Sequence, residues 1–410
     1  MTAPQPADLL SNAEHRAFLR ADTQAQYDFF DQSLRAEGGF YVLDFTGAPL
    51  PSAVQELHTT TRLVHSYALG QIAGRAGAER MVDHGLAYLR EYHRDADQGG
   101  YLWSLNGAAV QDGRKLAYGH AFVLLAAASA HAAGHPDALA LLEDVDHVLD
   151  THFWEEERGL FCDEWNRDWT PFSTYRGMNA NMHSIEAHLA AFEATGREKY
   201  LTRAGRILDF FVGRIAPAEG WRLPEHYTAD WQIDRGYSEN PMFRPAGTTP
   251  GHSFELARLL LQYNELVSSP SPERLETART LAYRAVSDAW DAEKGGFVYT
   301  LQFDGTPAIR DRYWWPVTEA IGVMAALLKS DPRAEDAEWY KTLWDFARAQ
   351  FIDPTHGGWF PEIDASGAPS ATQFAGKPDI YHSVQATLFP LTPKVSGAYR
   401  DLSGVLLADA

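Results

Sequence analysis

Three histidines stand in the same short pattern of His-Ser-x-Glu or His-Ser-x-Gln. They are His183 in "MHSIEA", His252 in "GHSFEL" and His382 in "YHSVQA". Each one opens or continues an apolar run with helical spacing. An imidazole can move protons near neutral pH, bind a metal ion, or serve only as a helix contact, so the pattern allows three interpretations.

A metal site is the weaker of the two functional interpretations. The three histidines fall on three different predicted helices, and no pair has the i,i+4 spacing of a helical zinc motif. A single helical histidine is more often structural, and an i,i+3 His/Glu pair contributes only a few tenths of a kcal/mol. The joint placement of the three histidines, described below, favours proton transfer, and we expect no metal.

A glycine-rich segment recurs along the chain and explains why the pattern repeats. Segments such as "QGGYLWSLNG" and "KGGFVYTLQFDG" place a glycine at 39, 100, 159, 220, 296 and 358, with intervals of 61, 59, 61, 76 and 62 residues. Each alternates apolar and polar residues before a turn, which is typical of a short strand. A period of this length indicates a repeated supersecondary unit.

The stretches between these segments have the 3.6-residue periodicity of amphipathic helices. The predicted helices are 12–35, 56–74, 78–93, 116–133, 136–151, 179–195, 197–214, 250–267, 271–289, 315–330, 334–351 and 379–391. The last one is apolar and lacks the polar cap that an open solenoid needs, so the six pairs are expected to close on themselves. We predict an all-α protein, an (α/α)6 barrel, forming one domain over 1–410. The even-numbered helices are apolar on more than one side and are placed inside.

In such a ring the six inner helices begin at one mouth, where the unusual polar residues gather. In chain order these are Arg62, Tyr118, Asn179, His183, His252, Glu255, Trp315, Glu319 and His382. Thr249 and Asp379 are the expected helix caps, with Pro250 and Pro316 at first helical positions, so His252 and His382 fall in first turns. The helix dipole there disfavours a charged imidazole, which suits a base–acid pair. Glu255 could orient the ring of His252 or bind a sugar hydroxyl, and Arg62 could stabilise a developing oxyanion.

Composition narrows the class of protein. The chain has 35 basic and 55 acidic residues, a net charge of −20, which disfavours nucleic acid and anionic membranes as partners. Cys162 is the single cysteine, and the N-terminus shows no signal-peptide pattern. No stretch approaches eighteen consecutive apolar residues. These features predict a soluble cytoplasmic protein, a monomer or a small homo-oligomer.

The stretches "TPGHSFELARLLL", "YWWPVTEAIG", "NANMHSIEA" and "DIYHSVQA", together with the six-fold repeat, resemble the N-acylglucosamine 2-epimerase superfamily. The resemblance runs over nearly the whole chain and is strongest to the aldose–ketose isomerase branch, which includes D-mannose isomerase and sulfoquinovose isomerase. It implies an (α/α)6 barrel that acts on a free monosaccharide without a metal or other cofactor.

Carried over to this chain, the resemblance implies that His382 exchanges the proton at C2 and that His252 is the second acid–base. Arg62 would stabilise the enediolate oxygen, with His183 supporting the same site. Substrate-contacting or supporting roles are implied for Tyr118, Asn179, Glu255, Trp315 and Glu319.

The expected reaction is the interconversion of D-mannose and D-fructose through a cis-enediol. Sulfoquinovose isomerase is an alternative that needs cationic or amide groups near C6, for which Arg244 and Gln373 are available. A cellobiose or N-acylglucosamine 2-epimerase is a second alternative, because the sequence does not show where the proton returns. A glycoside hydrolase on the same barrel and a non-catalytic sugar-binding protein are more distant ones.

Overall fold

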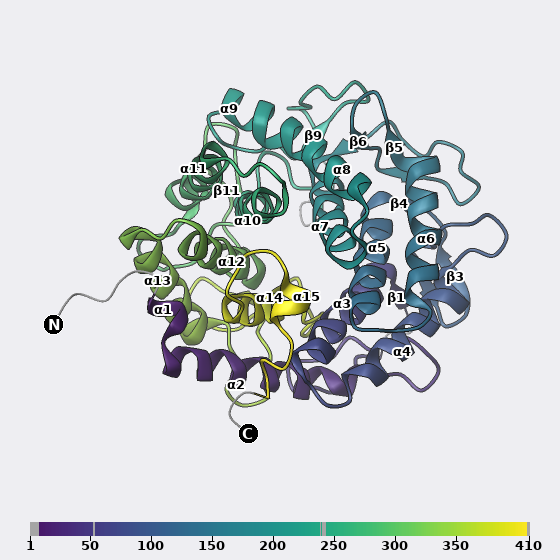
Figure 1. Cartoon of the computed structure of the whole chain (residues 1–410), viewed down its shortest axis with the longest axis horizontal. Coiled ribbons are helices and arrows are strands. Elements are labelled where there is room, and N and C mark those ends of the chain that lie inside the picture. Colours follow the sequence, from purple (N-terminus) through teal and green to yellow (C-terminus); the bar gives the residue numbers. More distant parts are fainter. Residues whose placement is uncertain (1–7, 52–53, 238, 240–242, 408–410) are drawn as a thin grey trace.

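The computed structural model describes residues 8–51, 54–237, 239 and 243–407, and arranges them as two concentric rings of helices (Figure 1). The inner ring consists of helices buried over most of their length, because they are covered on both sides. Within the described residues these inner helices are α3 (Leu57–Ala73), α5 (Ala117–Ala132), α7 (Met178–Thr195), α10 (Pro250–Leu266), α12 (Trp314–Ser330) and α14 (Tyr381–Leu388).

The outer ring has one helix packed against each inner one, with charged residues on its outward face. In the described part of the chain the outer helices are α2 (Ala13–Phe30), α4 (Ala78–Tyr88), α6 (Ala138–Val148), α8 (Glu198–Leu208), α11 (Pro272–Ala289) and α13 (Ala334–Gln350). Helices α4, α6, α8, α11 and α13 each pack on the inner helix that precedes them, whereas α2 packs on α14. Short helices α1 (Asp8–Ser11), α9 (Ala216–Ala218) and α15 (Ala398–Asp401) complete the set.

The ring closes where the first and last repeats meet. Helix α14 contacts α3, and Thr23 of α2 donates a hydrogen bond of 2.7 Å to Thr387 of α14. A β-bridge between Leu43 and Lys377 joins the same two repeats at the mouth. The predicted (α/α)6 barrel is therefore confirmed, with the predicted inner and outer helices in their expected rings.

Most helix bounds differ from the prediction by one or a few residues, and two inner helices also begin differently from the expected capping pattern. Helix α12 begins at Trp314 after the cap Tyr313, so Pro316 is its third residue and not its first. The cap of α14 is Ile380, although Asp379 still accepts a hydrogen bond of 2.9 Å from the backbone N–H of Tyr381. Thr249 caps α10 as predicted.

Short antiparallel strand pairs connect successive repeats at the mouth. The strand leading into an inner helix pairs with a strand of the next repeat, as β4 (Lys115–Leu116) does with β7 (Glu164–Trp165). The same arrangement holds for β8 (Arg176–Gly177) with β9 (His226–Tyr227), β12 (Arg312–Tyr313) with β13 (Glu362–Ile363), and β1 (Val54–Glu56) with β2 (Ser104–Asn106). The remaining strands are β3 (Ala109–Asp112), β5 (Trp154–Glu155), β6 (Leu160–Phe161), β10 (Thr300–Leu301) and β11 (Pro307–Ile309).

The paired glycines serve as turns, and a buried ion pair holds each of two such turns in place. In the sixth repeat Gly357 and Gly358 have φ angles of 84° and 71°, which favour glycine. Lys377 is buried beside that turn and donates to Asp353 at 2.8 Å and to the carbonyl of Gly357 at 2.6 Å. Lys115, Asp95 and Gly99 repeat this arrangement in the second repeat. In these two repeats the lysine thus ties the glycine turn to the segment that leads into the inner helix.

Among the described residues, no helix combines the length and the apolar character needed to cross a lipid bilayer.

Candidate active site

A cavity lies where the inner helices begin, and it collects the residues that the sequence placed at the mouth. Of the nine predicted site residues, those that line it are Arg62, Tyr118, Asn179, His183, His252, Glu255, Trp315 and His382. Glu319 lies behind this lining and reaches it through His382. Further lining residues include His58, Tyr299, Trp314, Phe374 and Asp379.

His252, in the first turn of α10, is held by a carboxylate that the helix pattern did not predict. Its Nδ1 lies 2.9 and 3.0 Å from the two carboxylate oxygens of Glu225, the residue directly before β9. Glu225 also accepts the backbone N–H of the cap residue Thr249 at 3.1 Å. Of the two roles expected for Glu255, orienting the His252 ring is excluded because Glu225 occupies that position, and binding of a sugar hydroxyl stays a prediction.

His382, in the first turn of α14, has a matching partner. Its Nδ1 lies 2.8 Å from Glu319 of the neighbouring helix α12. The other oxygen of Glu319 accepts from Nε of Arg258 at 3.4 Å. Burial alone would raise the pKa of Glu319, but the Arg258 guanidinium and the hydrogen-bonded His382 together outweigh it and hold that pKa below the usual range. Glu319 is thus able to accept a hydrogen bond from the Nδ1–H of His382.

The two histidines share one aromatic neighbour. The ring of Trp315 lies 5.1 Å from the His252 ring and 5.8 Å from the His382 ring, centre to centre, with tilts of 32° and 33°. Gly251 permits this approach, because a Cβ there would lie 2.2 Å from Trp315. The two imidazoles therefore lie along one indole ring, and all three side chains line the cavity.

The carboxylates fix which nitrogen of each ring is available. An ionised carboxylate only accepts, so Nδ1 of both His252 and His382 carries the proton. Nε2 of each ring then has a free lone pair, and it makes no hydrogen bond to any described residue. Each ring can accept a proton at Nε2 while its carboxylate stabilises the resulting imidazolium.

Arg62 supplies the positive charge of the cavity. Its guanidinium donates to Asp379 at 3.1 Å and to the hydroxyl of Tyr118 at 2.9 Å, and lies 4.7 and 4.8 Å from the rings of Phe122 and Tyr381. Burial opposes its charge, but Tyr118 and Asp379 reverse that effect and raise the pKa of Arg62. A permanently charged donor at this position can stabilise an oxygen that gains negative charge.

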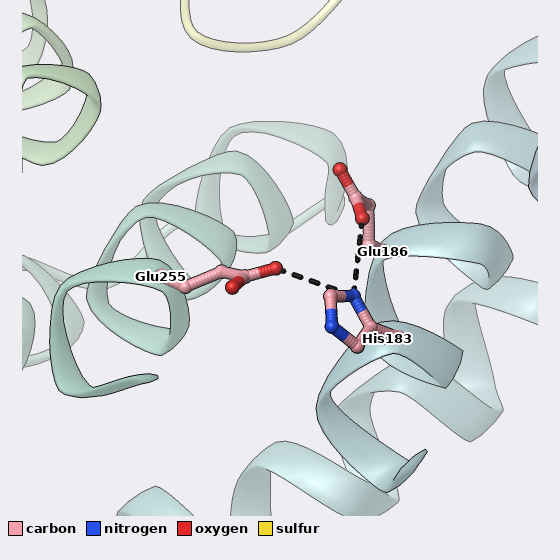
Figure 2. Close-up of side chains that lie close together, drawn as sticks. All are labelled: His183, Glu186 and Glu255. Atoms are coloured by element: carbon pink, nitrogen blue, oxygen red, sulfur yellow. Dashed lines mark ion pairs between the residues drawn. The ribbon is translucent and has the colours of Figure 1, made fainter. Parts of the chain in front are cut away.

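His183, Glu186 and Glu255 form a buried cluster between α7 and α10 (Figure 2). Nδ1 of His183 lies 3.6 Å from Glu186 and 3.4 Å from Glu255. Burial lowers the pKa of His183 to about 4, so its ring is neutral at pH 7. Burial, with the charges of Glu319 and Glu186, raises the pKa of Glu255 well above its ordinary value. Neither oxygen of Glu255 has a hydrogen-bond partner among the described residues.

The same three side chains are close enough together to ligate a metal ion. The charge of Glu186 is, however, already compensated. Its carboxylate accepts the hydroxyl of Tyr381 and lies 3.7 Å from the guanidinium of Arg258. A cation at the cluster would face that guanidinium, which opposes binding. Glu255 and His183 are therefore better suited to hydroxyl groups than to a metal.

Five tryptophans that could offer a flat apolar surface to a sugar ring have different positions. Trp314 and Trp315 line the main cavity, and Trp103 lines an adjoining compartment. Trp359 is buried and donates to Asp22, away from both spaces, and Trp165 lines neither of them.

Glu225 escaped prediction because it lies in a strand segment and not on a helix. A signal existed in the repeat itself. "LPEHY" around Glu225 corresponds to "FCDEW" around Asp163, and both place a carboxylate at the position whose backbone carbonyl accepts the first N–H of the preceding inner helix. Aligning the repeats would have singled it out as a partner for the next inner helix.

Comparison with known proteins identifies relatives along most of the chain. The family model described as N-acylglucosamine 2-epimerase matches residues 38–386. A D-mannose isomerase of Thermobifida fusca is 43% identical, covering 95% of this chain and 98% of that protein. A D-mannose isomerase of Pseudomonas cannabina pv. alisalensis is 38% identical, covering 92% of each.

The fold leads to the same group. A crystal structure of D-mannose isomerase superposes with a TM-score of 0.86 at 34% identity, covering 92% of this chain and 97% of that one. The family match and these relatives agree with the barrel and with the resemblance drawn from the "PGHSFE" and "YWWPVTE" stretches. This chain belongs to the N-acylglucosamine 2-epimerase family.

Proposed function

We propose that the protein is an aldose–ketose isomerase that interconverts D-mannose and D-fructose. The observation that carries the proposal is the pair of carboxylate-held imidazoles, His252 and His382, placed along the ring of Trp315. Isomerisation through a cis-enediol needs one group to remove a proton and another to move protons between oxygens. The relatives named D-mannose isomerase support this choice of substrate.

In the proposed reaction Nε2 of His382 removes the proton from C2 of the open-chain sugar. Electrons shift towards O1 as the enediolate forms, and the guanidinium of Arg62 stabilises the charged oxygen. His252 moves a proton between the O1/O2 side and C1, and assists ring opening. The proton returned to C1 completes the ketose, so no net oxidation occurs and no redox cofactor is needed.

The buried cluster is proposed to bind the sugar and not to act as an acid or base. A neutral carboxyl at Glu255 can both donate and accept, which suits a hydroxyl group, and His183 lies beside it. Tyr118 and Asn179 complete the proposed contacts, because both line the cavity and the Oδ1 of Asn179 has no described partner. We propose metal-independent catalysis, so prolonged dialysis against EDTA should leave kcat unchanged. Loss of activity that Zn2+ or Mn2+ restores would overturn this part of the proposal.

A neutral sugar is favoured over a sulfosugar. Arg244, the cation available for an anionic C6 group, already donates to Glu164 at 2.7 Å and lies over the ring of Tyr175. The backbone of Gln373 is bound to Glu362. The positive charge of Arg244 is thus neutralised within the protein, and we expect poor turnover of sulfoquinovose.

Replacement of the histidines tests the proposal against a glycoside hydrolase and a binding protein. His252→Ala and His382→Ala should each abolish conversion of mannose to fructose while sugar binding persists. A hydrolase would instead need two free carboxylates across the scissile bond. Of the described carboxyl groups at the main cavity, Glu225 and Glu319 are each engaged by a histidine and Asp379 by Arg62, so Glu255 has no free carboxylate opposite it. Wild-type cleavage of mannosides, or full activity in both histidine variants, would contradict the proposal.

A 2-epimerase is the remaining candidate, because it uses the same proton abstraction and returns the proton to C2. Product analysis separates the two, since epimerisation of mannose yields glucose and isomerisation yields fructose. We expect fructose as the main product. A role in carbohydrate metabolism in the cytoplasm follows from this proposal and agrees with the single buried Cys162.

A further inference from the structure

A second compartment adjoins the main cavity, between the starts of α5 and α7 and the strand β9. The two spaces share His58, Tyr118, Asn179 and Phe243 as lining residues, so these side chains border both of them. The side compartment, as we call it, also has Trp103 and Asp163 in its lining. Of the residues that line only the side compartment, the proposed reaction uses Glu225 alone, as the partner of His252.

Asp163 presents one free oxygen to this compartment. Its Oδ2 accepts the backbone N–H of Gly177, the cap residue of α7, at 2.7 Å. Its Oδ1 makes no hydrogen bond to any described residue, although the side chain is buried and only 7% of the residue is exposed. An acceptor atom that borders a cavity and has no partner in the described part of the chain can take one from a bound ligand.

The repeat explains why the oxygen is free. In the fourth repeat Glu225 makes the equivalent bond to the cap residue Thr249, and its carboxylate also holds His252, three residues after that cap. In the third repeat the residue three after the cap Gly177 is Ala180, which lines the side compartment. Asp163 is therefore the counterpart of Glu225 without a histidine, and open space replaces the imidazole.

The surroundings of Asp163 suit a neutral hydroxyl group. Burial raises the pKa of Asp163 to about 8, so the carboxyl can donate as well as accept at pH 7. Arg244 in the same lining is already bound to Glu164 and offers no free charge to an anion. Trp103 and Tyr175 supply the flat apolar surfaces that sugar C–H groups pack on.

We propose that the side compartment binds the C4–C6 end of the sugar, with the free oxygen of Asp163 hydrogen-bonded to the hydroxyl on C6. The inference rests on the proposed isomerase function, in which C1 and C2 occupy the main cavity between His252 and His382. Asp163 is then a specificity-determining residue that touches the substrate far from the reacting carbons.

Truncating the residue and the sugar together tests this assignment. D-lyxose has the configuration of D-mannose from C2 to C4 but lacks the C6 hydroxymethyl group. Asp163→Ala should lower kcat/KM for mannose by about 10-fold, the value of one hydrogen bond to a buried group, and change that for lyxose by less than about 2-fold. An equal fall for both sugars, or no fall for either, would overturn the inference.

Glu362→Ala is the matched control. Glu362 also accepts backbone N–H groups, those of Thr372 and Gln373, but it lines neither space. It should leave the ratio of the two kcat/KM values unchanged. If Asp163→Ala does not fold, the wild type still provides a test, because 6-deoxy-D-mannose should react about 10-fold less efficiently than mannose. A wild type that converts neither mannose nor lyxose would refute the proposed function itself, which is a separate outcome.

Discussion

At the scale of single residues, the candidate site consists of two imidazoles whose Nδ1 atoms are each held by a buried carboxylate. Glu225 lies 2.9 Å from His252, and Glu319 lies 2.8 Å from His382. The carboxylate keeps the proton on Nδ1, orients the ring and stabilises the imidazolium formed during turnover. The sequence predicts both histidines and Glu319 at this mouth, but not Glu225.

Glu225→Gln tests the importance of that orientation. Glutamine can present its amide N–H to Nδ1, which favours the tautomer with its proton on Nε2 and removes the base. We expect kcat for mannose to fall on the order of 100-fold with little change in KM, as measured by steady-state kinetics. Glu219→Gln, at a carboxylate paired with Arg235 away from the cavity, is the control and should stay near wild type. An unchanged kcat in Glu225→Gln would show that His252 needs no carboxylate.

At the scale of elements, the site depends on how closely α10 approaches α12. Gly251, the second residue of α10, lies against the ring of Trp315, and a Cβ there would come within 2.2 Å of it. The helix periodicity predicted both helices but not this contact, because a single sequence does not show which glycines face a neighbouring ring. Pro316 illustrates the same limit, since the first-turn N–H groups of a helix have no helical partner and proline fits several of those positions, while α12 begins two residues earlier, at Trp314.

Gly251→Ala is expected to push Trp315 and shift the two histidine rings beside it. Small displacements of reacting groups are costly, so we expect kcat/KM for mannose to fall by at least about 10-fold. Gly213→Ala is the matched control, because its Cβ would meet nothing within 4 Å. Full activity of Gly251→Ala, with wild-type stability, would mean that the position of Trp315 is not critical.

At the scale of the whole molecule, the ring of repeats is what the sequence predicted best. Gly-rich turns at intervals near 61 residues and twelve stretches with helical periodicity were sufficient to predict the ring. Closure followed from the cap-free last helix and is confirmed by the contact between α14 and α3. Partners that come from different repeats, such as Asp379 for Arg62, were missed because their pairing depends on the geometry of the ring.

Burying histidines throughout this ring makes the stability of the fold depend on pH. Desolvation lowers the pKa of each of five buried imidazoles to about 3 or 4, namely His65, His93, His120, His183 and His188. As pH falls below 6.5, these histidines take up protons in the unfolded chain but stay neutral in the folded one, so the free energy of unfolding decreases. Buried Asp22, Asp163 and Glu255 have the opposite effect. Burial raises their pKa values, so their contribution to the free energy of unfolding is lost as pH rises.

The imidazoles outnumber these carboxyls, so we expect a net loss of unfolding free energy on the order of 3 kcal/mol between pH 6.5 and pH 5. Urea unfolding at a series of pH values measures this directly. His93→Gln should reduce the slope, whereas His147→Gln, at an exposed position, should not. A stability that stays constant or increases over this interval would contradict the account of the buried histidines.

Isotope exchange tests the central claim, that His252 and His382 move protons on a free sugar, most directly. The protein is incubated in deuterated water with mannose, fructose, glucose, cellobiose and sulfoquinovose in turn, and products are followed by NMR and mass spectrometry. We predict interconversion of mannose and fructose with solvent deuterium at C1 of fructose or C2 of mannose, and loss of exchange in His382→Ala. Absence of exchange with every sugar would contradict the account.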